Sequence, residues 1–193
     1  DLSAKMIEAG RRFCRYGSIR LLVGDGERLE EVVGGQSFDY VLYNASIFIL
    51  PDAHRSINAA VGCLRPGGKI AFSFYPQLRG RGHLDLITEA FRRLEIPPPR
   101  YRVITSYDSA CASLGQLCGP VTHFSWERPM TTSFLKDFFA IPAQSASLFP
   151  KLDEQRRRTS VARLFDTLAD VADSSRIVWP MAASTKPKSF PVS

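Results

Sequence analysis

The chain has 193 residues, of which 45% are hydrophobic and 23% charged, which is enough to bury the core of one soluble domain. It contains neither the roughly 20-residue apolar run of a membrane-spanning helix nor an apolar signal-peptide core, so we predict a cytoplasmic protein without a membrane partner. The net charge of +6 would suit a polyanion, but the basic residues stand in short scattered groups without a nucleic-acid motif, which favours a solvated surface.

The first half of the chain alternates helical and strand patterns. Apolar residues at helical spacing, with Ser3 at the N-cap, predict a helix over 3–16 that ends at Gly17. The apolar run Ile19–Val23 is β-branched at both ends, which is typical of a strand buried on both faces. Further along, the pattern predicts a helix over 27–33, a strand over 38–44, a helix from Pro51 to about Leu64, a strand over 69–75 and a helix over 84–94. This alternation indicates a parallel sheet with helices on both faces.

The pattern changes beyond residue 100. Strands are predicted over 100–107, 121–126 and 176–185, and helices over 132–140 and 152–172. The segment 110–120 fits either type of element.

Three polar residues are predicted to lie at strand ends, where open parallel sheets bind their ligands. Asp1 precedes the first helix, Asp25 follows the first apolar run, and Asn44 follows the next strand. A carboxylate there could accept hydrogen bonds from a nucleoside, and Gly26 would let the backbone approach a flat ring. A simple turn at residues 25 and 26 explains the same pattern. Asp39 starts its strand and is interpreted as structural.

The order of four stretches carries a family resemblance: "DLSAKMIEAG", "LLVGDGERL", "FDYVLYNASIFILPD" and "CLRPGGKIAFSFY". Over residues 1 to about 75 the chain resembles class I S-adenosylmethionine-dependent methyltransferases of the broad small-molecule group often called type 11. The resemblance implies an α/β, Rossmann-like sheet, mostly parallel, with helices on both faces. It also implies a C-terminal antiparallel hairpin, to which we assign the strands near 121 and 177.

The resemblance also assigns roles in binding S-adenosyl-L-methionine. It implies that Asp1 holds the ribose hydroxyls, that Leu2 and Met6 pack against the adenine, and that Asp25 accepts from the adenine amino group beside the Gly26 backbone. Asn44 would lie next to the methionine portion and the methyl group. The implied domain spans residues 1–185, with a cofactor-binding part over 1–96, an acceptor or lid region over 97–174, a last strand over 175–185, and a flexible tail over 186–193.

The chain departs from the family at one motif. The glycine-rich loop that follows the family's first strand is missing, because no GxGxG occurs in the sequence, and the chain does not begin with methionine. We therefore expect an N-terminally truncated fragment that binds the cofactor more weakly than the full-length protein.

Methyl transfer needs a general base only where the acceptor must lose a proton. Of the three histidines, His83 follows the strand predicted over 69–75 and is the preferred candidate, ahead of His54 and His123. The segment 100–150 is rich in aromatic residues, which suit a planar or apolar acceptor, a mobile lid or ordinary packing. The four cysteines show neither Cys-x-x-Cys spacing nor a histidine cluster, so we predict no metal site and interpret them as reduced core residues.

The sequence thus predicts a methyltransferase that acts on a small-molecule acceptor. A second hypothesis is a catalytically inactive methyltransferase-like module that binds nucleic acid or a protein partner through its basic surface. A nucleotide enzyme of another Rossmann-like class, such as a dehydrogenase, fits the motifs less well.

Overall fold

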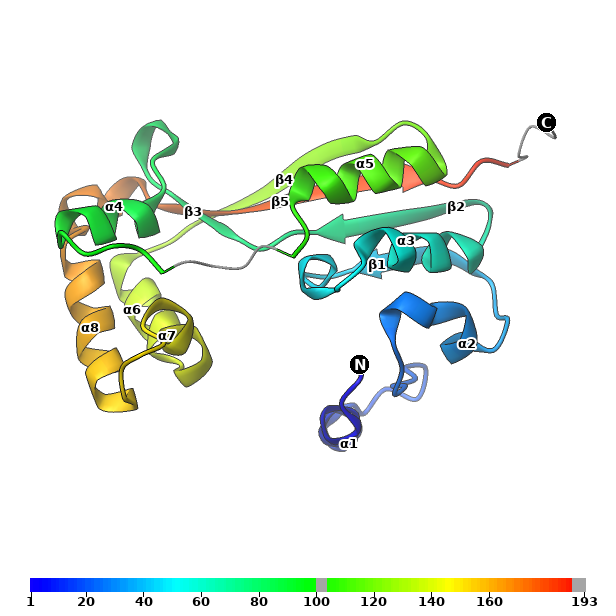
Figure 1. The fold of residues 1–193 in the computed structure, drawn as a ribbon, viewed down its shortest axis with the longest axis horizontal. Coiled ribbons are helices and arrows are strands. Elements are labelled where there is room, and N and C mark those ends of the chain that lie inside the picture. Colours follow the sequence, from blue (N-terminus) through cyan, green and yellow to red (C-terminus); the bar gives the residue numbers. More distant parts are fainter. Residues whose placement is uncertain (100–103, 189–193) are drawn as a thin grey trace. The chain divides into compact units, whose positions relative to one another are not determined.

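A computed structural model describes residues 1–99 and 104–188 of the chain (Figure 1). The chain divides into two compact units, each made of separate segments. We call the first unit Asp1–Phe74, Val103–Phe124 and Met181–Ser193, and the second unit Tyr75–Arg102 and Ser125–Pro180.

Three helices of the first unit lie close to their predicted positions: α1 (Ala4–Phe13), α2 (Leu29–Val33) and α3 (Ala53–Gly62). A fourth helix, α5 (Tyr107–Cys118), covers most of the segment 110–120, which fitted either type of element. The hydroxyl of Ser3 accepts from the backbone N–H of Met6, which confirms the predicted cap, although α1 ends at Phe13, before Gly17. Asp52 caps α3, so this helix begins two residues after Pro51. Gly34 ends α2 in the left-handed conformation, with φ of 62°.

The sheet of the first unit contains one parallel and one antiparallel pairing. Strand β1 (Phe38–Tyr43) runs parallel to β2 (Leu64–Ser73), and β2 pairs antiparallel with β5 (Arg176–Thr185), with Ser73 opposite Met181. The "RPGG" residues lie within the bounds of β2, before the predicted start at 69, because Gly67 and Gly68 exchange backbone hydrogen bonds with Lys186.

The second unit contains the remaining elements. They are β3 (Gln77–Arg79), α4 (Leu86–Arg93), α6 (Thr132–Ala140), α7 (Pro142–Leu148) and α8 (Glu154–Asp166). Strand β3 pairs antiparallel with β5, and β4 (Thr122–Pro129) also pairs with β5. The pairing expected between the strands near 121 and 177 is therefore confirmed, whereas α7 was not predicted.

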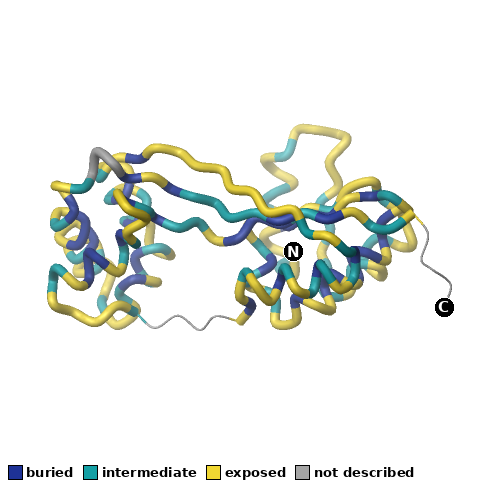
Figure 2. Tube along the Cα trace, turned by 90° about the horizontal axis from the view of Figure 1, so that it is seen from above, coloured by how far each residue is buried: buried dark blue, intermediate teal, exposed yellow. Residues whose placement is uncertain are grey.

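Each unit has its own apolar core, and the two clusters share no residue (Figure 2). The first is built around Ile57, Ile70 and Phe72, and the second around Leu164 and Phe165, all of them at most 1% exposed. Cys63 and Cys118 are free thiols buried in the first unit. Among the described residues, no helix is both long and apolar enough to cross a membrane.

The strand predicted over Ile19–Val23 does not form. Ile19 is 52% exposed and Val23 is 50% exposed, so the expectation of burial on both faces is wrong. A strand needs backbone partners along its length. This segment meets Asp1 only near its end, where the Gly24 N–H donates to the Asp1 carbonyl and the Asp1 amino group donates to the Leu22 carbonyl. The α/β class is confirmed, with helices flanking a sheet of mixed rather than mostly parallel pairing.

A second strand prediction fails in part. Residues 100–103 of the strand predicted over 100–107 lie outside the described residues, but residues 104 and 105 form a bend and Tyr107 starts α5. Ser106 and Ser109 form a reciprocal capping box there, which explains why a helix begins at this point.

Candidate functional site

Asp25 caps a short 3-10 helix, Gly26–Arg28. Its Oδ1 accepts from the Glu27 backbone N–H at 2.9 Å, so the turn predicted at this position is present. None of the described residues donates to the other carboxylate oxygen, Oδ2. A turn and a ligand site are therefore compatible here, because the cap uses only one of the two oxygens.

Asp1 lies beside the segment that leads to Asp25. Its carbonyl accepts from the Gly24 N–H at 3.0 Å, its amino group donates to the Leu22 carbonyl at 3.2 Å, and its Oδ1 accepts from the Ser3 N–H at 2.7 Å. These contacts bring the two predicted carboxylates into neighbouring segments of the first unit. The apolar side chains of Leu2 and Met6 are 74% and 63% exposed, and so are open to a ligand.

A buried serine that the sequence reasoning missed connects the Gly26 loop to β1. The Ser56 hydroxyl donates to the Gly26 carbonyl at 2.8 Å, and the Tyr43 hydroxyl donates to the Ser56 carbonyl at 2.8 Å. Ser56 is 0% exposed, and burial raises the pKa of Tyr43 to about 12, so this phenol stays a neutral donor. A serine on the apolar face of α3, one turn from Ala53 and next to Ile57, was the available signal.

Asn44 follows the end of β1 and is exposed, as predicted for a strand-tip residue. Its Oδ1 accepts from the Ser73 hydroxyl at 3.1 Å, and the same hydroxyl oxygen accepts from the Ala45 N–H at 2.8 Å. Ala45 has φ of 50°, which is uncommon for a residue with a Cβ. Ser73 is 7% exposed and was not singled out by the sequence.

His83 and the residues described above belong to different units of the chain. His83 belongs to the second unit, where it is exposed and its carbonyl accepts from the Arg79 guanidinium at 3.0 Å. His123 belongs to the first unit, and its Nδ1 lies 3.0 Å from the hydroxyl of Tyr107. That hydroxyl donates its proton to the Met181 carbonyl at 2.9 Å, so its oxygen accepts from the Nδ1–H of His123.

The aromatic residues of the predicted acceptor region fall into two groups. Phe139 and Phe149 pack against Phe165 and Phe91 in the second unit, which is ordinary core packing. Phe124, Trp126 and Phe134 are between 42% and 50% exposed. Tyr101 lies outside the described residues.

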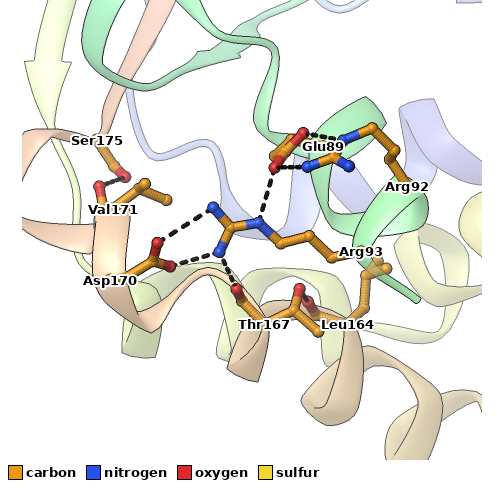
Figure 3. A network of polar contacts seen from close by, with 8 residues as sticks. All are labelled: Glu89, Arg92, Arg93, Leu164, Thr167, Asp170, Val171 and Ser175. Atoms are coloured by element: carbon orange, nitrogen blue, oxygen red, sulfur yellow. Dashed lines mark hydrogen bonds and ion pairs between the residues drawn. The ribbon is translucent and has the colours of Figure 1, made fainter. Parts of the chain in front are cut away.

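Ion pairs involve some of the arginines that the sequence places in clusters. Glu89 accepts from both Arg92 and Arg93, and Arg93 also donates to Asp170 and to the Thr167 carbonyl (Figure 3). These hydrogen bonds lower the pKa of Glu89 to about 2. Further pairs join Arg12 to Glu8, Arg28 to Glu31, Arg65 to Asp39, Arg156 to Asp153, Arg158 to Glu154 and Arg176 to Glu127. In the described part of the chain, no three His, Cys, Asp or Glu side chains cluster as a metal site would require.

Residues 1–72 match a family described as a methyltransferase domain. No curated protein sequence matches the chain. Three solved structures share its fold, and their identity to the chain is 14% or less. A protein of Bacillus halodurans assigned as a methyltransferase has 11% identity and a TM-score of 0.54, with 97% of this chain and 81% of that chain covered.

The YcgJ protein of Bacillus subtilis has 14% identity and a TM-score of 0.53, with 98% and 81% covered. A protein of Galdieria sulphuraria assigned as a sarcosine dimethylglycine methyltransferase has 12% identity and a TM-score of 0.52, with 98% and 69% covered. The match confirms that residues 1–72 resemble a methyltransferase domain, and the three structures show that the chain shares their fold.

Proposed function

We propose that the protein is an S-adenosyl-L-methionine-dependent methyltransferase that acts on a small-molecule acceptor. The match of residues 1–72 to a methyltransferase domain carries this proposal. The positions of Asp1, Asp25 and Asn44 in the first unit support it, because their polar groups suit a ligand that contains a nucleoside and an amino acid.

The chain's own residues fit the cofactor at its nucleoside end. Asp25 keeps one carboxylate oxygen for the adenine amino group, while the Ser56 contact holds the neighbouring Gly26 backbone in place. Asp1 would hold the ribose hydroxyls, and the exposed side chains of Leu2 and Met6 would cover the adenine ring. When bound, the cofactor supplies an activated methyl group for in-line transfer, so the protein's main task is to align the acceptor and exclude water.

Residues 1–96 would bind the cofactor, residues 97–174 would shape the acceptor site, and residues 175–185 would complete a single functional domain. Where the acceptor must lose a proton, His83 is the proposed base.

The proposal is tested by Asp25→Ala in the full-length protein, with calorimetric titration of S-adenosylhomocysteine. Loss of a charge-assisted hydrogen bond of about 1.5–3 kcal/mol should weaken binding by about 10- to 150-fold. Asp39→Ala is the matched control, because this exposed carboxylate pairs with Arg65 and belongs to no proposed ligand site. Equal affinities of wild type and Asp25→Ala would reject the assignment of Asp25.

The second candidate, an inactive module that binds nucleic acid or a protein partner, is less well supported. Several of the clustered arginines that suggested it are paired with acidic neighbours, as at Arg92, Arg156 and Arg158. It predicts salt-dependent association with RNA, and a flat fluorescence-anisotropy titration at low salt would count against it.

A further inference from the structure

Ser73 links the end of β2 to the two residues that follow β1. Its hydroxyl oxygen accepts from the Ala45 N–H at 2.8 Å and lies 3.1 Å from Asn44 Oδ1. A hydroxyl has one proton, and an amide carbonyl oxygen can only accept. The proton of Ser73 is therefore committed to Asn44 Oδ1. The side chain that makes both bonds is 7% exposed, whereas Asn44 and Ala45 are exposed.

This arrangement fixes the orientation of the Asn44 side-chain amide. Oδ1 accepts from Ser73, which fixes the orientation of the amide, whereas none of the described residues accepts a hydrogen bond from the amino group Nδ2, so its N–H groups are available to a ligand. The bond to the Ala45 N–H also fixes the backbone next to Asn44, in the left-handed conformation that residues with a Cβ seldom adopt. The residue that follows β1, Asn44, therefore presents the two N–H groups of its Nδ2 in a fixed orientation.

We infer that Ser73 is a positioning residue, which holds Asn44 as the hydrogen-bond donor to the carboxylate of the cofactor's amino-acid portion. This inference rests on the proposed function. Asp1 and Asp25 offer only acceptors, which suit the hydroxyl and amino groups of a nucleoside. The carboxylate is the strongest acceptor in the cofactor, and it needs N–H donors such as those of Asn44.

The test compares two ligands in the full-length protein by calorimetric titration. S-adenosylhomocysteine contains the amino-acid portion, and 5′-methylthioadenosine lacks it. Ser73→Ala should weaken the first ligand by about tenfold and leave the second unchanged, because one oriented hydrogen bond is lost. Ser73→Thr keeps the hydroxyl and should restore most of the affinity. Asn44→Asp replaces the donors by a second carboxylate oxygen and should weaken S-adenosylhomocysteine at least as much as Ser73→Ala.

Asn44→Asp changes an exposed residue, so it tests the inference even if a variant of the buried Ser73 fails to fold. If both Ser73→Ala and Asn44→Asp bind S-adenosylhomocysteine like the wild type, or if they weaken both ligands equally, the inference is wrong while the proposed function stands. A wild-type protein that binds neither ligand would instead contradict the proposed function, and with it the inference.

Discussion

Among the described residues, the buried polar side chains of the first unit are all hydroxyls, whereas the second unit also buries a carboxylate, that of Glu89. In the first unit, the neutral hydroxyls of Ser56 and Ser73 hold backbone and amide oxygens next to the candidate site. In the second unit, Glu89, Arg93 and Asp170 form ion pairs that tie α4 to the residues after α8 (Figure 3). The hydroxyl contacts hold uncharged groups next to the candidate site, whereas the ion pairs use their carboxylates to hold helical segments together.

The largest expected effect comes from removing one core ring in each unit. Phe72→Ala and Phe165→Ala should each cost about 3–5 kcal/mol of unfolding free energy, because both side chains are at most 1% exposed. Both tryptophans, Trp126 and Trp179, belong to the second unit. Because the two cores share no residue, Phe165→Ala should lower the midpoint of the unfolding transition seen by tryptophan fluorescence more than Phe72→Ala does. Far-UV circular dichroism would report the unfolding of the whole chain. Identical shifts of both probes in both variants would mean that the chain unfolds as one cooperative unit.

A smaller effect tests the neutral contacts of the first unit. Ser56→Ala should cost about 1–3 kcal/mol, because it leaves the Gly26 carbonyl without its buried donor. Urea denaturation should give the same loss at pH 5 and pH 8, since a hydroxyl does not titrate in this range. Ser18→Ala is the control, because this exposed serine should change stability by no more than about 0.5 kcal/mol. A loss that varied strongly with pH would show that a charged group takes part.

The stabilising effect of the ion pairs of the second unit should, by contrast, depend on pH. The hydrogen bonds from Arg92 and Arg93 lower the pKa of Glu89 from 4.5 to about 2. Its stabilising effect is therefore complete above about pH 4.5 and is lost as the pH falls towards 2. Glu89→Gln should lower the melting temperature at pH 7, and its difference from wild type should shrink between pH 4.5 and 2. A difference that stayed constant down to pH 2 would contradict the role of the charge.

Sequence patterns correctly located the helices and strands that are determined by residues within or next to them. The predicted bounds of α6 and β5 agree with the structure, and the cap at Ser3 was identified correctly. The run Ile19–Val23 has an equally clear strand pattern but lacks the neighbours that β2 provides for β1. Strand formation depends on pairing with distant segments, which a short window of sequence does not contain.

The same difference between local and distant partners explains which residues of the candidate site could be predicted from the sequence. Asp25 and Asn44 were identified because each follows an apolar run. Ser56 and Ser73 were missed because their partners lie 30 and 29 residues away along the chain, at Gly26 and Asn44. Their only local signs are small polar residues among apolar neighbours, in a helix and at the end of a strand, and such serines are common.

Within the described residues, β1 pairs with β2 along one side alone. The backbone N–H groups of a strand alternate between its two sides, so those on the unpaired side lack a sheet partner among these residues. In deuterated solvent, β1 should then show fast and slow isotope exchange at successive amides, whereas β2, with β1 on one side and β5 on the other, should exchange slowly throughout its paired residues. Residue-resolved exchange would thus detect any chain segment that occupies this edge, whatever the sequence of that segment.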